Sequence, residues 1–329
     1  MRPLKQLVAA MLWILAFIPL NLFVMAAFLR QAITLKPGDR SNPPAGDDDG
    51  LIRQFVENNL RYIELRQGDE GLGTRYERLM VDRLLANLAL RFGIRRALES
   101  PADGITGVPG ANSLVLDGLL ERPMTLTNPS LNLIRAAVKT WEGRKVAAIA
   151  APVAALPFAD RCFGLAWSFC MVEKLSRPVE YLRELARVSP GLVLVVAINR
   201  ANLGNTLHRW YHRLSRSTWD HGREDLTCLS GLAEAFHRAG LEVLETGAVD
   251  VPPSIDTQDM PLKDDIQRVA GLFGRRWEWR LEGASVGRSK VLDYLCWLED
   301  NLPGWFKMIN AHHIYVLGRT ARSQADAGC

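Results

Sequence analysis

The sequence predicts an α/β fold in which a mostly parallel sheet carries helices on both faces, preceded by an apolar N-terminal helix. Three observations predict it. Strand-like and helix-like segments alternate regularly from residue 97 onward, which is typical of a parallel sheet. The segment GLVLVVAI at 191–198 is almost continuously apolar, as expected for a strand buried on both faces. Residues 7–29 carry no charge, and roughly 20 apolar residues are enough to cross a bilayer.

The apolar run predicts an uncleaved membrane anchor, to which we assign residues 1–36. A cleaved signal peptide is the alternative, with Ala26 and Ala27 near the cleavage site. The run is longer than the apolar core of a usual signal peptide, which favours the anchor. Basic residues stand on both sides of the run, so the positive-inside rule does not determine its orientation.

A linker and a helical region are expected between the anchor and the sheet. Residues 37–50 (PGDRSNPPAGDDDG) combine proline, glycine and three consecutive aspartates, a composition typical of a solvated linker. Residues 51–94 show helical patterns and are predicted to form a cap over one edge of the sheet. Within them, Thr74 and Glu77 have the spacing of a capping box at the start of a helix.

The core is expected at 95–250, with its last strand supplied by 312–322. Its strands are expected at 97–99, 124–127, 145–151, 163–169, 191–198, 241–249 and 312–319. Its helices are expected at 111–122, 130–141 and 178–188, with a further cationic helix within 199–216. Residues 251–311 form an insertion rich in tryptophan that could face a substrate or a membrane, and 323–329 form a polar tail expected to be disordered.

Composition and charge exclude several classes of protein. The net charge of +4 is small and the basic residues are scattered, so nucleic-acid binding is not indicated. The five cysteines are odd in number and have no CxxC spacing, which disfavours a disulfide framework or a zinc site and suits a reducing compartment. No metal is predicted.

The first strand leads into a turn suited to a nucleotide-type ligand. The strand ends in Glu99, and the segment PADGITGVPG at 101–110 holds three glycines before the next helical segment. Glycines let the backbone approach a ligand closely, and a helix N-terminus offers free N–H groups. An ordinary tight turn is the alternative, because a lone glycine motif has low specificity.

Three later segments, in order, resemble the class I S-adenosylmethionine-dependent methyltransferases of the type 11 kind. They are LPFADRCFGLAWSF (156–169), SRPVEYLRELARV (176–188) and the strand GLVLVVAI. The resemblance covers roughly 95–250. It implies a Rossmann-like sheet of seven strands, mostly parallel with the final strand antiparallel, and S-adenosylmethionine as cofactor.

The resemblance also implies positions for the cofactor. Glu99 would anchor the glycine turn, Asn128 would face the ribose hydroxyls, and Pro152 and Val153 would lie near the adenine. Phe169 and Cys170 would face the methyl donor and the substrate. The turn itself would contribute Pro101, Asp103, Gly104 and Gly107.

The same positions depart from the family pattern. Pro101 and Asp103 stand where the family has glycines, and Asn128 stands where it has a carboxylate. Pro152 stands where it has an aspartate that accepts from the adenine amine. Charge-assisted hydrogen bonds are about twice as strong as neutral ones, so these departures favour a domain that no longer transfers methyl groups.

The substrate side offers candidates on the cationic helix and the loop after it. His208 and His212 share one helical face, with Tyr211 beside them, and a solvated surface is the alternative reading. His221, in a loop, is the candidate general base.

These features together predict a membrane-anchored, single-pass methyltransferase that acts on a lipophilic or membrane-associated small molecule. Its body is expected in the cytoplasm, where S-adenosylmethionine is made. The alternative is a catalytically inactive, methyltransferase-like domain that serves as a membrane-bound binding or assembly subunit. The oligomeric state is not predicted.

Overall fold

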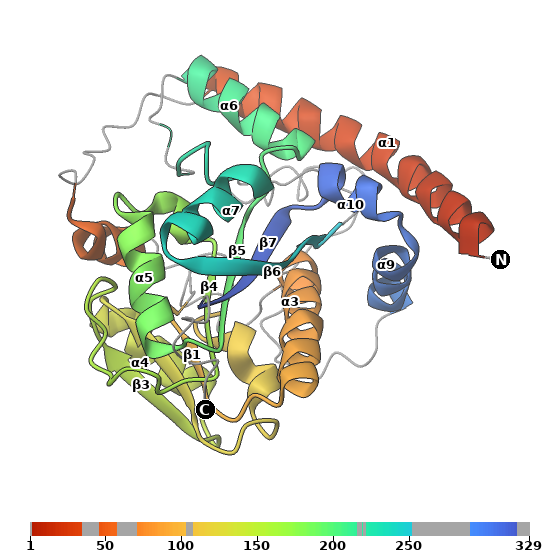
Figure 1. Ribbon diagram of the computed structural model, residues 1–329. Helices are drawn as coiled ribbons and strands as arrows, with labels where there is room; N and C mark the ends of the chain where they lie inside the picture. Colours follow the sequence, from red (N-terminus) through yellow and green to blue (C-terminus); the bar gives the residue numbers. More distant parts are fainter. Residues whose placement is uncertain are drawn as a thin grey trace.

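A seven-stranded sheet in the order β3-β2-β1-β4-β5-β7-β6 forms the centre of the computed structural model (Figure 1). The structure describes residues 2–34, 46–57, 71–102, 108–215, 219, 222–251 and 290–320. Strands β1 to β5 are parallel, and β7 runs antiparallel to both β5 and β6. The predicted fold class, including the antiparallel final strand, is confirmed.

The strands lie within two residues of their expected bounds. They are β1 (Ala97–Glu99), β2 (Met124–Asn128), β3 (Val146–Ala150), β4 (Leu165–Phe169), β5 (Leu192–Ile198), β6 (Leu241–Val249) and β7 (His313–Thr320). Every residue of β4 is buried, and so is nearly all of β5. These two strands are covered on both faces, which accounts for the apolar run that predicted them.

The helices cover both faces of this sheet. They are α1 (Arg2–Thr34), α3 (Gly71–Phe92), η1 (Ala111–Leu116), α4 (Leu131–Thr140), η2 (Val172–Lys174), α5 (Pro178–Val188), α6 (Leu203–Ser215), α7 (Leu229–Arg238), α9 (Lys290–Asn301) and α10 (Gly304–Asn310). The chain moves outward in one direction from β1 to β3 and in the other from β4 to β5. Because such crossovers are right-handed, η1 and α4 lie on the opposite face from α5. The direction reverses between β1 and β4, where open α/β sheets bind ligands.

The expected helix at 111–122 was wrong in type and length. The segment forms only η1, a short 3₁₀ helix that begins after Gly110 in the left-handed region, with φ 69°. Gly118 also has positive φ, so the chain turns soon after η1 ends. A Cβ on Gly110 would lie 2.9 Å from Leu126 Cδ1, so the close packing against β2 requires glycine at this position. The N-terminus of a long helix, expected beside the ligand, is therefore missing here.

The expected capping box on α3 was also wrong. The helix begins at Gly71, so Thr74 and Glu77 both lie inside it and neither caps its start. Glu77 is instead only 6% exposed. Its carboxylate lies in the interior near Asp250 and His313.

The segment at 156–160 is fastened to α5 by one arginine and one glutamate. Arg187 donates to both oxygens of Glu184 at 2.8 and 2.7 Å, and to the carbonyls of Leu156 and Phe158 at 3.1 and 2.8 Å. Glu184 Oε1 accepts in turn from the Leu156 amide at 2.7 Å. We call these contacts the Arg187 clamp. They give a physical reason for the glutamate and arginine spacing in the 176–188 segment.

Helix α1 lies along α6 and also contacts α9 (Figure 1). Trp13 packs edge-on against Phe306 of α10, with 5.0 Å between the ring centroids. Most other large side chains on α1 are exposed, among them Leu4, Leu7, Met11, Ile14, Leu15, Ile18 and Leu22. Of the described helices, α1 is the one long and apolar enough to cross a membrane, over Pro3–Phe23. A signal sequence or a core helix can pass the same test, and only a small part of this stretch is buried.

Candidate functional site

The carboxyl end of β1 carries a buried carboxylate that is tied to η1. Glu99 is fully buried, and its Oε2 accepts from Ser113 Oγ at 2.6 Å. Ser113 accepts in turn from Trp167 Nε1 of β4 at 3.1 Å. The hydrogen bonds therefore connect β4, η1 and β1 in one chain. In this arrangement Glu99 holds η1, the segment that follows the turn.

The start of the turn lies over the end of β2. The Ala102 amide donates to Thr127 O at 2.6 Å, and Asn128 Nδ2 donates to Ala102 O at 3.0 Å. Asn128 Oδ1 accepts from the Ser130 amide at 2.8 Å. Asn128 is 2% exposed, and both ends of its carboxamide have partners within the protein. Its local role is to hold the turn and to begin α4.

The loop after β3 contacts the expected linker. Val153 is buried, and its amide donates to Asp49 Oδ1 at 2.9 Å, while Pro152 is exposed. Asp48 Oδ1 accepts from the Ser176 amide at 2.7 Å. The aspartates at the end of the expected solvated linker therefore bind the body and begin a helix at 48–57. Residues 37–45 lie outside the described part of the chain.

The carboxyl end of β4 points at the start of β7. Phe169 is fully buried and Cys170 is 2% exposed. The ring centroid of Phe169 lies 4.9 Å from that of His313. Cys170 has a positive φ of 48°, an uncommon conformation for a residue with a side chain. The expected methyl-donor position therefore has an aromatic, water-poor wall with an imidazole beside it.

Glu173 of η2 is a buried acid that the sequence did not single out as a site residue. Its Oε1 accepts from the Ile198 amide at 3.2 Å, and its Oε2 has no hydrogen-bond partner within the described part of the chain. Burial raises the pKa of Glu173, against the opposing effect of the Lys174 ammonium. Gly222, with φ 86°, approaches so closely that a Cβ there would lie 2.5 Å from Glu173 O. Gly222, the residue that follows the candidate base His221, therefore lies close to η2.

Several predicted site residues are not placed by the structure. Asp103, Gly104 and Gly107 lie outside the described residues, and so does His221. His208 and Tyr211 belong to α6, but their side chains are outside the description. The ring of His212, on the same helix, lies 5.4 Å from that of Trp219. Pro101 is buried at the start of the turn.

A buried polar cluster lies at the carboxyl end of β6, where no motif predicted a site. Glu77 of α3, Asp250 after β6 and His313 of β7 bring one ligand atom each within 4.8 Å of one another. His312 Nδ1 lies 3.2 Å and His313 Nδ1 3.4 Å from the same oxygen, Asp250 Oδ2. Burial acts to raise the pKa of Asp250, but the two imidazoles outweigh it, and this pKa lies below its ordinary value.

A second acid continues this cluster toward α9 and α10. Glu299 Oε2 accepts from Tyr76 Oη and from the Val251 amide, both at 2.8 Å. Lys307 Nζ lies 3.5 Å from Glu299 Oε1. Burial raises the pKa of Glu299, while the Lys307 ammonium acts in the opposite direction. These contacts join α3, α9 and α10 through polar groups rather than through apolar packing alone.

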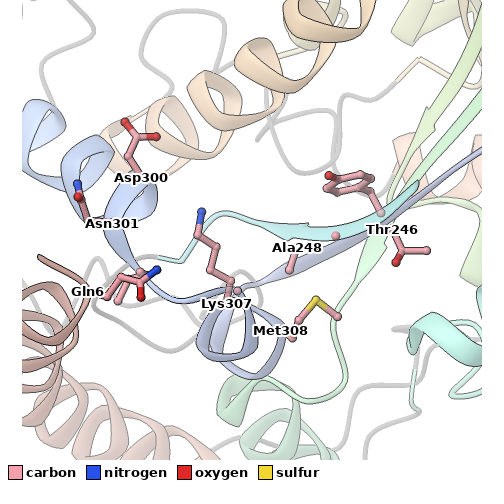
Figure 2. Close-up of a pocket in the computed structure, with 11 residues that line it drawn as sticks. Gln6, Thr246, Ala248, Asp300, Asn301, Lys307 and Met308 are labelled. Carbon is pink, nitrogen blue, oxygen red and sulfur yellow. The ribbon is translucent and has the colours of Figure 1, made fainter. Parts of the chain in front are cut away.

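A cavity of about 450 Å³ borders this region (Figure 2). It lies between α1, β6, α9 and α10, and its lining includes Gln6, Thr246, Ala248, Lys307 and Met308. Figure 2 shows the Lys307 ammonium reaching into the space between Gln6 and Ala248. The cavity is at the β6 edge of the sheet, several strands from the end of β1.

Comparisons with known proteins agree with this architecture. Residues 107–195 match the family profile described as a methyltransferase domain. The match begins after Glu99 and the first half of the turn, where the sequence departs most from the family pattern. A search of curated protein sequences finds no match.

Solved structures with the same fold are numerous but distant in sequence. The [4+2]-cyclase SpnF is 18% identical, with a TM-score of 0.52, covering 86% of this chain and 100% of its own. A putative methyltransferase in complex with the Haloferax volcanii Trm112 activator is 15% identical, with a TM-score of 0.48, covering 83% and 99%. The magnesium protoporphyrin IX methyltransferase ChlM from Synechocystis PCC 6803, with bound SAH, is 14% identical, with a TM-score of 0.48, covering 62% and 94%. The likeness to SpnF shows a shared Rossmann-like fold, and at 18% identity it leaves the activity open.

S-adenosylmethionine is the cofactor that the methyltransferase-domain match supports, and the described residues fit it in part. Glu99 is in place to hold the turn, and Phe169 supplies a buried aromatic wall. Asn128 Oδ1 accepts one hydrogen bond, and a carbonyl oxygen has two lone pairs, so it can accept one more. The fit is weaker at the adenine position, because the side chain of Pro152 has no acceptor for the adenine amine.

Proposed function

We propose that this chain is a membrane-anchored, S-adenosylmethionine-dependent methyltransferase that acts on a lipophilic or membrane-associated small molecule. The observation that carries the proposal is the joining of two parts in one chain. The segment at 107–195 matches a methyltransferase domain, and α1 is apolar enough to span a membrane and packs against the same body.

The proposed cofactor position is the carboxyl ends of β1, β2 and β4. When bound there, the cofactor supplies a methyl group on a positively charged sulfur. Glu99 would hold the turn that contains Gly104 and Gly107, and Asn128 would accept from a ribose hydroxyl. Phe169 would exclude water next to the methyl group, which favours an in-line transfer in a dry pocket.

A membrane source for the substrate is supported by the exposed apolar side chains beside α1. On α6, Trp210 and Leu214 are 53% and 55% exposed, and on α10, Trp305 and Ile309 are 66% and 51% exposed. Both helices neighbour α1 (Figure 1). Aromatic side chains of this kind favour a bilayer interface. In this proposal the body lies on the cytoplasmic side, where the cofactor is made, and α1 crosses once.

The acceptor would approach from α6 and the loop that follows it. His208, Tyr211 and His212 are the proposed substrate contacts, with His221 as the proposed base. The contact between the rings of His212 and Trp219 supports this, because Trp219 lies two residues before His221 in the sequence. A base within hydrogen-bond reach of the acceptor typically contributes about 10²–10⁴-fold to the rate.

A second function is an inactive, methyltransferase-like binding or assembly subunit at the membrane. Its supporting observation is Asn128, whose carboxamide is already hydrogen-bonded at both ends to Ala102 and Ser130. The short η1 supports it as well, because the turn lacks the N-terminus of a long helix for binding an anion.

A titration separates the two functions. The full-length protein in detergent micelles is titrated calorimetrically with S-adenosylmethionine and S-adenosylhomocysteine, beside Gly104→Arg and the control Gly304→Arg. A Cβ on Gly304 meets nothing within 4 Å, so that variant tests for a general effect of an added arginine. The methyltransferase function is supported if the wild-type protein and Gly304→Arg bind these compounds with micromolar affinity and Gly104→Arg does not. A folded wild-type protein that binds neither compound at millimolar concentration refutes it.

The acceptor is then sought in the membrane. Purified protein is incubated with radiolabelled S-adenosylmethionine and total membrane lipid, and label is followed into the organic phase. Label that enters the organic phase supports a lipophilic acceptor, and its loss when His221 is substituted supports a base at that position. If label appears only in the aqueous phase, the lipophilic part of the proposal is wrong, although the methyltransferase activity stands.

A further inference from the structure

The buried cluster of Glu77, Asp250 and His313 has the composition of a metal site. It joins an acid of α3, an acid at the end of β6 and the first residue of β7. The three side chains are 6%, 2% and 2% exposed. Their nearest ligand atoms all lie within 4.8 Å of one another. Two carboxylates and an imidazole thus meet in a region from which water is largely excluded.

The geometry at His313 points to a ligand between these groups. Its Nδ1 is buried and has no hydrogen-bond partner among the described residues, although it lies 3.4 Å from Asp250 Oδ2. In the neutral tautomer with the proton on Nε2, His313 Nδ1 and Asp250 Oδ2 are both acceptors, with no donor between them. A cation between the two atoms would bind both lone pairs and would also offset the charge of the buried carboxylates.

The remaining polar groups nearby are already engaged elsewhere. Tyr76 Oη and the Val251 amide both donate to Glu299, which is also the carboxylate nearest to the Lys307 ammonium. His312 donates its backbone amide to Asp250 O at 2.8 Å, which holds Asp250 in its left-handed conformation with φ 70°. These contacts orient Asp250 toward Glu77 and His313.

We propose that Glu77, Asp250 and His313 bind a divalent transition-metal ion, such as Zn²⁺. An imidazole with two carboxylates suits first-row transition metals better than Mg²⁺ or Ca²⁺, which favour oxygen ligands alone. Zinc–ligand bonds are about 2.0–2.2 Å long, so the group contracts when the ion binds. The three ligands come from α3, the end of β6 and β7, so the ion ties these elements together and leaves the fourth position of a tetrahedral ion to a small ligand such as water.

The test uses the full-length protein in detergent micelles, without a polyhistidine tag and after removal of metal with a chelator. Zn²⁺ and Mg²⁺ are titrated separately, and Co²⁺ is added as a spectroscopic probe whose visible absorption reports its ligands. The variants are His313→Gln and Glu77→Gln, and the control is His237→Gln, which removes an exposed histidine of α7. Thermal unfolding shows that each variant is folded.

The proposal expects one Zn²⁺ per chain, with Mg²⁺ binding far more weakly, and a Co²⁺ spectrum that His313→Gln changes and His237→Gln does not. We expect Zn²⁺ affinity to fall by more than roughly 100-fold in His313→Gln, because changes outside the ligand set already cost about 10–100-fold. Absence of stoichiometric binding by the wild-type protein overturns the proposal, and so does unchanged binding by His313→Gln. If His313→Gln does not fold, the wild-type titration and Glu77→Gln decide in the same way. None of these measurements involves S-adenosylmethionine, so they are independent of the proposed methyltransferase activity.

Discussion

The Arg187 clamp makes a quantitative prediction for stability. Lysine at this position keeps the positive charge but loses the planar fork that binds both oxygens of Glu184 and two backbone carbonyls. The Arg187 side chain is 33% exposed, so each lost bond is worth about 1 kcal/mol rather than the larger value of a buried charged pair. Losing two or three of them should lower the free energy of unfolding by about 2–3 kcal/mol.

Thermal unfolding of the full-length protein, followed by circular dichroism at neutral pH, measures this loss. At roughly 2–4 °C per kcal/mol, we expect Arg187→Lys to unfold about 5–10 °C below wild type. The control is Arg183→Lys on the exposed side of the same helix, where the guanidinium makes a bond of 2.8 Å to Arg238 O. If both lysine variants unfold at the same temperature, the clamp contributes no measurable stability and the reasoning is refuted.

The same contacts predict that the stability of the fold depends on pH. The hydrogen bond from Arg187 lowers the pKa of Glu184, against the raising effect of partial burial. A carboxyl group with a lowered pKa stabilises the fold at pH values above its pKa in the unfolded chain, about 4.3. That stabilisation is lost as the pH falls through the folded-state pKa. The stability difference between wild type and Glu184→Gln should therefore shrink below about pH 4. A constant difference from neutral pH to pH 3 would contradict this origin.

Three further substitutions test contacts elsewhere. Gly110→Ala puts a Cβ 2.9 Å from its nearest neighbour at φ 69° and should cost about 1–3 kcal/mol in urea unfolding. The control Gly143→Ala, at φ 78° with nothing within 4 Å, carries the backbone strain without the clash, and an equal loss would show that the clash is unimportant. Asp49→Asn weakens the acceptor of the Val153 amide, whose hydrogen exchange should become faster; unchanged exchange would mean that this contact does not form in solution. Trp13→Ala should speed amide exchange in α10 by removing the ring contact with that helix, and slow exchange there would show that α1 does not pack on it.

Much of the fold could be predicted because its signals are local. A run of apolar residues predicts the buried strand at 191–198. A proline at the first position predicts the start of the helix at 178–188. The prediction of a helix over 111–122 was wrong because two positive-φ glycines, Gly110 and Gly118, limit the segment to a short 3₁₀ helix. A pattern of apolar residues gives no information on that backbone conformation.

The buried cluster could not be predicted for a different reason. Glu77, Asp250 and His313 are far apart in the sequence, and each alone resembles an ordinary surface residue or cap. They meet because α3 packs near β6, and because β6 and β7 pair antiparallel with Val249 opposite His313. The three side chains come together through the strand pairing and through the packing of α3 near β6. The candidate cofactor positions were predictable by resemblance, but their internal hydrogen bonds, such as those of Asn128, were not.

The contacts of Asp48 and Asp49 set the length of the connection between α1 and the body. Helix α1 ends at Thr34, and the chain is fastened to the body again from Gly46, whose carbonyl accepts from Arg177 at 3.2 Å. At about 3.3–3.6 Å per residue, even a fully extended chain between these points reaches only roughly 40 Å. If α1 is embedded in a bilayer, the body can never leave the layer of solvent next to that surface. Its search for a substrate would then be a two-dimensional one, and lipid-soluble molecules would reach it at a far higher local concentration than molecules dissolved in the surrounding water.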